Sequence, residues 1–160
     1  MKALGKHLPQ KLRMTSSGFT LIELMVTIAV LAIIVSIAAP SISNQLANER
    51  VKSTTATLVN ALKEAKVESV IRRQSLEFSF DDSKHTILIK SKNSGSNPIA
   101  THSYNAKSVI KANKTSIVFS PSKRADAVTY NICDSKNTSI SMQVIVTAVA
   151  NISTVAGGTC

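Results

Sequence analysis

The sequence has little of what catalysis usually requires. Only three histidines, His7, His85 and His102, occur among its 160 residues. No glycine-rich loop follows a predicted strand, as a phosphate cradle would need, and no serine has a recognisable histidine and aspartate arrangement. His85 follows Asp81 and Asp82, but the three fall in a predicted hairpin turn, where such side chains are usually hydrated. We therefore predict no enzyme, no metal site and no cofactor.

Acidic residues are few, and none precedes residue 19. The net charge is +10, from 19 basic and 9 acidic residues. The basic residues Lys2, Lys6, Lys11 and Arg13 lie ahead of an apolar run over residues 19–39, which is long enough for a helix that spans a bilayer. Basic residues before a span predict that the N-terminus stays in the cytoplasm while the rest of the chain crosses.

Three interpretations of residues 1–40 compete. A secretory signal cut after a small residue such as Ala38 would have an unusually long apolar run. An uncut anchor would keep its basic leader. A cut between Gly18 and Phe19 would remove the leader and create an α-amine four residues before Glu23. Since a charge within a membrane usually has a partner, and residues four apart on a helix are neighbours, this cut gives Glu23 a cationic partner in its own chain or in an adjacent subunit.

The stretch Gly18-Phe19-Thr20-Leu21-Ile22-Glu23-Leu24-Met25 resembles the cleavage motif of type IV prepilins and type II secretion pseudopilins. The resemblance implies that a prepilin peptidase cuts after Gly18 and methylates Phe19, and that Glu23 directs assembly. Pro40 falls where many type IV pilins carry a helix-distorting proline. The implied partners are other major and minor pilins, contacted through the N-terminal helix, together with the peptidase and an inner-membrane assembly platform.

Glycine and proline are both absent from residues 41–74, so we predict that one long helix continues to about residue 74. Its apolar residues, including Val51, Leu58 and Leu62, recur at helical spacing. Beyond it, alternating patterns predict strands at 76–80, 86–90, 108–111, 116–119, 127–133 and 139–149. The predicted fold class is α+β, with a long N-terminal helix packed on an antiparallel sheet; whether there is one sheet or two stays open.

Three stretches of this region resemble the GspH/FimT/FimU group of minor pilins and pseudopilins. They are residues 68–74, 117–124 and 130–133, although Ser122-Lys123 replaces the group's usual small-glycine pair. The implied division is a cleaved leader at 1–18, a membrane and fibre-core segment at 19–40, and a periplasmic head at 41–160. The implied function is a minor pilin at the tip or priming complex of a type IV pilus. The alternatives are a GspH-like pseudopilin, or a DNA-binding minor pilin of natural transformation.

The two cysteines are Cys133 and Cys160. If the head is exported, it enters an oxidising compartment where a disulfide can persist. Such a bond would tie the C-terminal segment to the domain and stabilise it by roughly 3–4 kcal/mol. The alternative is a pair of buried thiols.

Basic residues raise the question of DNA. Arg72 and Arg73 close the predicted helix, where cations suit the helix dipole. The alternative is a stripe that binds phosphates, formed by Lys107, Lys111, Lys114, Lys123 and Arg124. In the GspH/FimT/FimU group that this chain resembles, the DNA-binding members carry a Gly-Arg-x-Arg pattern near the C-terminus. The corresponding residues here, 150–153, lack the glycine and both arginines. DNA binding is therefore not favoured.

Overall fold

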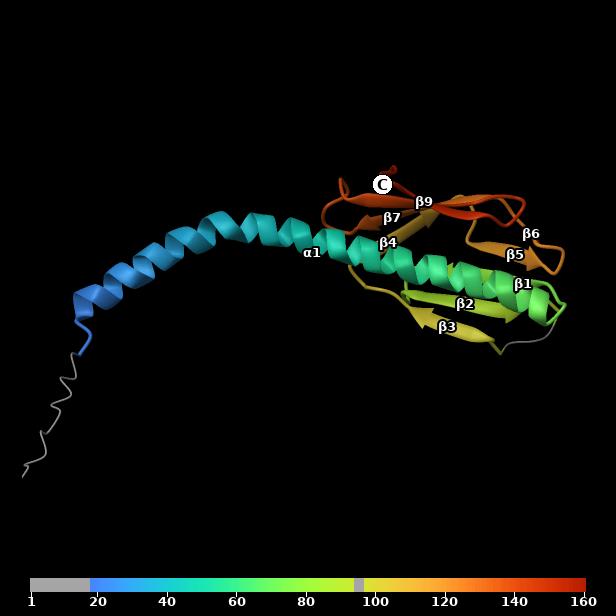
Figure 1. The fold of residues 1–160 in the computed structure, drawn as a ribbon, viewed down its shortest axis with the longest axis horizontal. Coiled ribbons are helices and arrows are strands. Elements are labelled where there is room, and N and C mark those ends of the chain that lie inside the picture. The colour runs from blue at the N-terminus through green and yellow to red at the C-terminus, as the bar shows by residue number, and fades with distance from the viewer. Residues whose placement is uncertain (1–17, 94–96) are drawn as a thin grey trace, which may run out of the picture. The chain divides into compact units, whose positions relative to one another are not determined.

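The computed structural model describes residues 18–93 and 97–160, without the side chains of residues 38–40. The chain divides into two compact units, Met1–Ala39 and Pro40–Cys160. Helix α1 covers Leu21–Ile71, so it belongs to both units (Figure 1). We call Pro40–Cys160 the head. All of the buried core residues lie at Ala47 or beyond it, so the head contains a complete hydrophobic core of its own.

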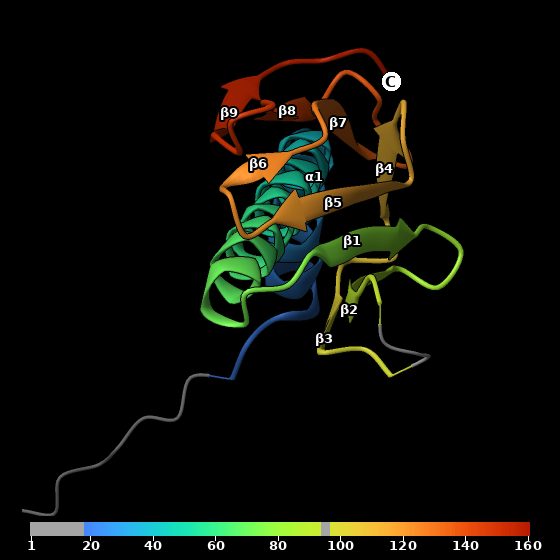
Figure 2. The ribbon, with the colours of Figure 1, turned by 90° about the vertical axis from the view of Figure 1, so that its right-hand side faces the viewer.

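In the described part of the head, nine strands follow the helix, and all pair antiparallel. They form two sheets, in the orders β3-β2-β1-β5-β6 and β4-β7-β8-β9 (Figure 2). The sequence left the number of sheets open, and the answer is two. The strands are β1 (Leu76–Asp81), β2 (Thr86–Ser91), β3 (Ala100–Ser103), β4 (Ser108–Ala112), β5 (Ser116–Ser120), β6 (Arg124–Ala125), β7 (Val128–Asp134), β8 (Ser141–Val146) and β9 (Ile152–Ala156).

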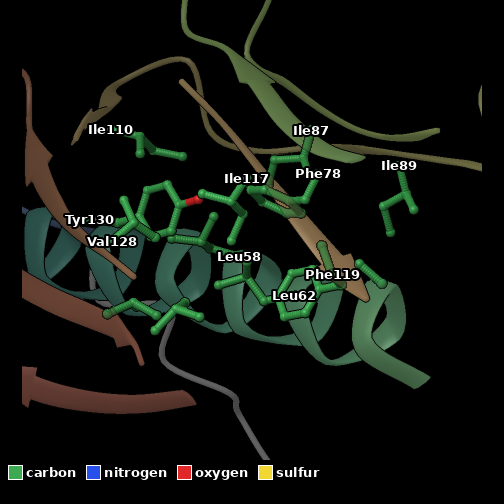
Figure 3. Packing of buried hydrophobic residues seen from close by; sticks show 14 of the residues in the cluster. Leu58, Leu62, Phe78, Ile87, Ile89, Ile110, Ile117, Phe119, Val128 and Tyr130 are labelled. Atoms are coloured by element: carbon green, nitrogen blue, oxygen red, sulfur yellow. The ribbon is translucent and has the colours of Figure 1, made fainter. Parts of the chain in front are cut away.

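The core joins the helix to both sheets. Leu58 and Leu62 project from α1 towards Phe78 and Phe119 of one sheet and towards Tyr130 of the other (Figure 3). The Tyr130 ring meets the Phe78 ring edge-on at 6.0 Å between centroids. Such large apolar side chains, each fully withdrawn from water, contribute about 1.5–3 kcal/mol apiece. The predicted α+β class, with a helix on antiparallel sheet, is confirmed.

Several predicted element bounds need correction. The long helix ends at Ile71, three residues before the expected end, and it closes with two capping bonds, Arg73 N–H to Val70 C=O and Gln74 N–H to Ser69 C=O. Arg73 takes a left-handed φ of 52° at the position where this cap usually has glycine. Arg72 and Arg73 therefore follow the helix instead of forming its last turn.

The predicted strand at 139–149 is in fact shorter. It ends as β8 at Val146, because the chain turns at residues 147–151 through Ala150, whose φ is 53°, and returns as β9. The edge strands β3 and β6 were also missed. Their sequences, ATHS and RA, are too short to show an alternating apolar pattern.

Candidate functional site

The predicted cleavage bond lies just ahead of the helix. Gly18, Phe19 and Thr20 are outside α1, and all three are exposed. Nothing lies within 4 Å of the position that a Gly18 side chain would take. The bond between Gly18 and Phe19 is therefore accessible and free of helical hydrogen bonds, as a peptidase substrate should be. The leader at 1–17 lies outside the described residues.

Thr20 and Glu23 form the start of the helix. The Glu23 backbone N–H donates to Thr20 Oγ1 at 3.3 Å, which makes Thr20 the N-cap and Glu23 the third helical residue. A carboxylate in the first turn also favours the positive end of the helix dipole. The sequence prediction gave Glu23 only a pairing role and missed this capping arrangement, although the spacing Thr-x-x-Glu is the recognisable pattern for it.

Phe19 precedes the N-cap, so it lies outside the regular helix that the four-residue spacing assumed. A new amine on Phe19 would therefore sit on a short extended segment next to the first turn. The carboxylate of Glu23 and that amine are still only four residues apart, close enough in the chain to pair. The pairing stays a prediction.

The helical segment that follows is apolar on every side. Its large side chains are all exposed within the structure, by between 49% at Val30 and 77% at Leu21. Its internal hydroxyls are satisfied within the helix, since Thr27 Oγ1 donates to Leu24 C=O and Ser36 Oγ donates to Ile33 C=O. Between residues 19 and 37, Glu23 is the one ionisable side chain.

By length and composition, none of the helices in the described ranges can cross a membrane unbent, but the segments Leu21–Ile37 and Ser41–Ile71 could do so as a bent pair. Pro40 lies between them, among the three residues whose side chains are not described. Its distortion of the helix stays a prediction.

The basic candidates for DNA binding do not gather into one stripe. Lys107 lies near Arg50, at the start of the part of α1 that belongs to the head. Its backbone carbonyl accepts a hydrogen bond from the Ser135 N–H, next to the Arg50–Asp134 ion pair. Arg72 lies 22 residues after Arg50, which corresponds to about 33 Å of helix. Arg73 is its neighbour, and Lys123 and Arg124 share this end of the head through the Ser69 Oγ to Ser120 C=O hydrogen bond and the turn that follows it.

Two of these cations already have partners. The Arg72 guanidinium pairs with Glu68, and the Lys111 ammonium donates to the Cys160 carbonyl. Lys114 is exposed in the loop between β4 and β5. A phosphate backbone would thus meet separated, partly neutralised charges.

Asp134 anchors the base of the helix to β7, a role that the sequence did not reveal. Its side chain is 1% exposed and accepts the backbone N–H groups of Lys136 and Asn137, each at 3.0 Å, and the Arg50 guanidinium at 3.2 Å. Burial opposes its charged form, but these donors outweigh that effect and hold the pKa of Asp134 below its usual value. The turn that follows β7 is therefore built on this carboxylate.

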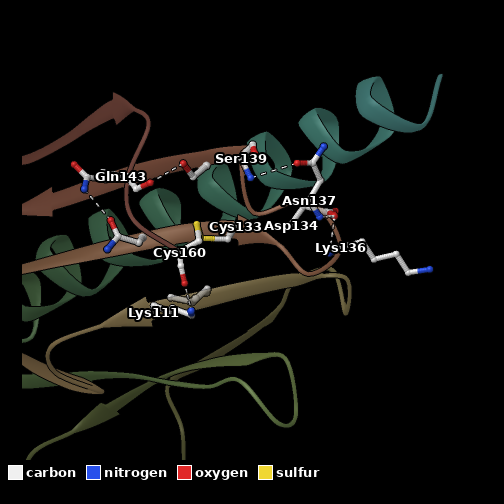
Figure 4. The surroundings of a disulfide bond; sticks show 12 residues. Lys111, Cys133, Asp134, Lys136, Asn137, Ser139, Gln143 and Cys160 are labelled. Carbon is white, nitrogen blue, oxygen red and sulfur yellow. Dashed lines mark hydrogen bonds between the residues drawn. A yellow bond between two sulfur atoms is a disulfide. The ribbon is translucent and has the colours of Figure 1, made fainter. Parts of the chain in front are cut away.

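Cys133 and Cys160 are joined in a disulfide, as predicted for an exported head (Figure 4). Residues 157–160, which we call the strap, pass from β9 across the outer face of β8 and β7. Gly158 has a φ of 142° and leaves no room for a side chain, because a Cβ would meet Asn131 and Gln143 at 2.9 Å. The strap is therefore held by three features: the close approach that Gly158 allows, the disulfide, and the hydrogen bond from Lys111 to the Cys160 carbonyl.

The residues considered for a metal have structural roles. Asp81 Oδ1 accepts the backbone N–H groups of Ser83 and Lys84 in the hairpin turn. Asp82 Oδ1 accepts from the Tyr104 hydroxyl and from the Ile110 N–H. Within the described ranges, no three such side chains converge in a way that could hold a metal ion.

Two features now define the fold: an exposed apolar helix with a single acid in its first turn, and a disulfide-closed head in which the helix packs on two antiparallel sheets. This is the pilin-like α+β fold. Residues 13–39 match the family described as the prokaryotic N-terminal methylation motif. A comparison with curated protein sequences finds no match.

Solved structures carry the same fold. A crystal form of the type IV minor pilin FimU from Pseudomonas aeruginosa matches with a TM-score of 0.59 at 19% identity, over 68% of this chain and 98% of that one. A second form gives 0.61 at 17%, over 70% and 96%. The minor pseudopilin EpsH from the type 2 secretion system of Vibrio cholerae gives 0.54 at 8%, over 67% and 97%. The chain thus combines the N-terminal methylation motif with the fold seen in the minor pilin FimU and the minor pseudopilin EpsH.

Proposed function

We propose that this protein is a minor pilin, held in the inner membrane as a single-span precursor and then built into a type IV pilus. The observation that carries the proposal is the exposed helix Leu21–Ile37, whose side chains need an apolar partner, with Glu23 alone charged in its first turn. Lipid supplies that partner in the precursor, and the helices of neighbouring pilins supply it in the fibre. The head would then lie in the periplasm, and later at the cell surface.

The proposed processing is a cut after Gly18, followed by methylation of Phe19. The accessible, non-helical bond at this position and the match of residues 13–39 support it. Mass spectrometry of the mature N-terminus tests it, with a methylated Phe19 start as the expected result. Gly18→Val should block the cut, and a Gly18→Val chain that still begins at Phe19 would disprove the site.

Glu23 would pair with a Phe19 amine and set the register of assembly. Because Glu23 also favours the helix N-terminus through its charge, the experiment must separate the two roles. Glu23→Gln removes the charge and keeps the shape, whereas Thr20→Val removes the N-cap and keeps the charge. We expect fibres to lose the Glu23→Gln subunit and to retain the Thr20→Val subunit, both inserting normally in the membrane. Equal incorporation of both would reject the registry role.

Within this class we favour a place in the tip or priming complex, with other major and minor pilins, the prepilin peptidase and the assembly platform as partners. The likeness of the head to FimU supports a pilus, and its likeness to EpsH supports a type II pseudopilus as the second candidate. Deleting the gene for this protein distinguishes the two candidates. Only a pilus subunit predicts loss of surface pili while type II secretion stays intact.

DNA capture is the weaker candidate. The basic candidates form no single stripe: Arg72, Arg73, Lys123 and Arg124 share one end of the head, Lys107 lies near the Arg50–Asp134 pair, and Lys111 and Lys114 belong to β4 and the loop after it. We expect the purified head to bind duplex DNA only weakly at low salt. Strong binding that falls steeply as salt rises would revive this function.

A further inference from the structure

The free edge of β9 stands out among the four sheet edges of the head. Natural edge strands are usually protected by charge, by shortness or by a cover. Edge β6 has only two residues, β4 carries Lys111, and β3 carries His102, which bonds to Glu64 at 2.7 Å. By contrast, β9 has five residues, Ile-Ser-Thr-Val-Ala, with no charge and no proline, and it pairs on one side only, with β8 (Figure 2).

The hydrogen-bond register shows which backbone groups face outward. Thr147 N–H donates to Asn151 C=O, and Gly157 N–H donates to Ser141 C=O, at the two ends of the β8–β9 ladder. Antiparallel pairs alternate between bonded and non-bonded. Ser153 and Val155 therefore bond to β8, and the N–H and C=O groups of Ile152, Thr154 and Ala156 point to the free edge.

A groove runs beside this edge, between β9 and the outer face of α1. It consists of two hollows of about 290 and 300 Å³. One is lined by Val67 and Ile152, and the other by Ala56, Val59 and Thr154. A strand added to β9 would lie over this groove, so its inward side chains would fill the two hollows.

The charge of the groove indicates the kind of strand that fits. Its lining includes Lys52, Lys63 and Lys66 and no acidic residue. Lys66 donates to the Ala150 carbonyl and Lys52 pairs with Glu49, whereas Lys63 is exposed. A second copy of this chain would bring the same lysines to its own edge and be repelled.

We propose that β9 is extended by a β-strand of a different subunit in the assembly, an extended segment with small apolar side chains facing the groove and acidic side chains near Lys63. This inference rests on the proposed function, because it places the partner among the subunits of the fibre. Backbone pairing gives such a contact its strength, and the lysines select the partner.

Thr154→Pro tests the pairing. Thr154 directs its N–H to the free edge, so a proline there removes the outward donor and leaves the bonds to β8 in place. We expect incorporation into fibres to fall by about tenfold, because the added strand loses the backbone hydrogen bond that the Thr154 N–H would donate. Lys63→Glu should lower it roughly two- to fivefold, and the matched control Lys63→Arg should leave it unchanged.

A photo-crosslinking residue at position 154, with position 153 on the opposite face of β9 as its control, reports contacts even if a variant folds poorly. The supporting result is a crosslink from 154 alone to an acidic extended segment of another subunit. A crosslink to β9 of a second copy, a crosslink to a partner helix, or no crosslink in assembled fibres would overturn the inference. So would normal incorporation of Thr154→Pro. If the wild-type chain never enters fibres, the proposed function fails, and this inference fails with it.

Discussion

Removing the disulfide should cost the head a predictable part of its stability. Cys133 and Cys160 are 27 residues apart, and the loop between them contains β8, β9 and the strap. The chain-entropy relation gives about 3.6 kcal/mol at 25 °C for a loop of this length. The head has about 120 residues, so its unfolding entropy is about 0.25 kcal/mol per degree, and Tm should fall by about 14 °C.

The measurement is thermal unfolding of the head, residues 41–160, followed by circular dichroism. The double variant Cys133→Ala/Cys160→Ala should melt about 14 °C lower than the oxidised wild type, and adding a reductant should lower only the wild type. Lys111→Met is the matched control, since it removes a contact of the strap and keeps the covalent bond. We expect it to cost less than about 1 kcal/mol.

The refuting result is a fall in Tm of less than about 4 °C for the double variant. It would mean that the unfolded chain gains little freedom when the loop opens, so the chain-entropy reasoning fails. The strap has other bonds, from Gly157 N–H to the Ser141 carbonyl and from Ser141 Oγ to the Gly158 carbonyl. Because these bonds act in the folded state only, their loss would add to the fall instead of hiding it.

Three other substitutions test separate parts of the head. Tyr130→Phe should raise stability by about 1 kcal/mol in urea unfolding, because the buried Tyr130 hydroxyl finds no hydrogen-bond partner among the described residues; a loss would show that the hydroxyl is bonded. Arg73→Gly should also stabilise, by roughly 0.5–1 kcal/mol, since Arg73 holds a positive φ at the helix cap. The lowered pKa of Asp134 means that its ionised form stabilises the fold above about pH 4 and that this stability is lost as the pH falls through the folded pKa. Asp134→Asn should therefore destabilise the head at pH 7 and flatten that acid dependence; an unchanged pH profile would contradict the assignment.

The parts of the fold that sequence could predict are those with a strong periodic pattern. The hairpin β1–β2 was expected, because Leu76, Phe78 and Phe80 alternate with polar residues. In the structure Phe78 and Phe80 lie opposite Ile89 and Ile87 of β2. The long helix was expected because glycine and proline are absent from it. Its end was misplaced, since the cap places an arginine where glycine is the usual marker, and no local rule signals that.

Contacts between distant residues could not be predicted. The partly buried pair of Arg50 and Asp134 joins positions 84 residues apart, and each looks like an ordinary surface charge in the sequence. The same applies to the free edge of β9, which depends on which strands find neighbours. The basic residues that sequence placed in one possible stripe are separated by the length of the head helix for the same reason.

The two units of this chain depend on different surroundings. The head encloses its own core and its own disulfide, so its stability can be measured in water with residues 1–40 removed. Among the described residues of its unit, the helix Leu21–Ile37 packs against no hydrophobic core. Its exposed side chains can leave water only in lipid or against other helices. Glu23 is the exception along that surface, because its charged carboxylate is well solvated in water and costs free energy in lipid. In the proposed function, a subunit that passes from membrane to fibre changes the partners of the helix while the head stays folded, so we expect substitutions at Glu23 to alter assembly without altering the melting temperature of the head.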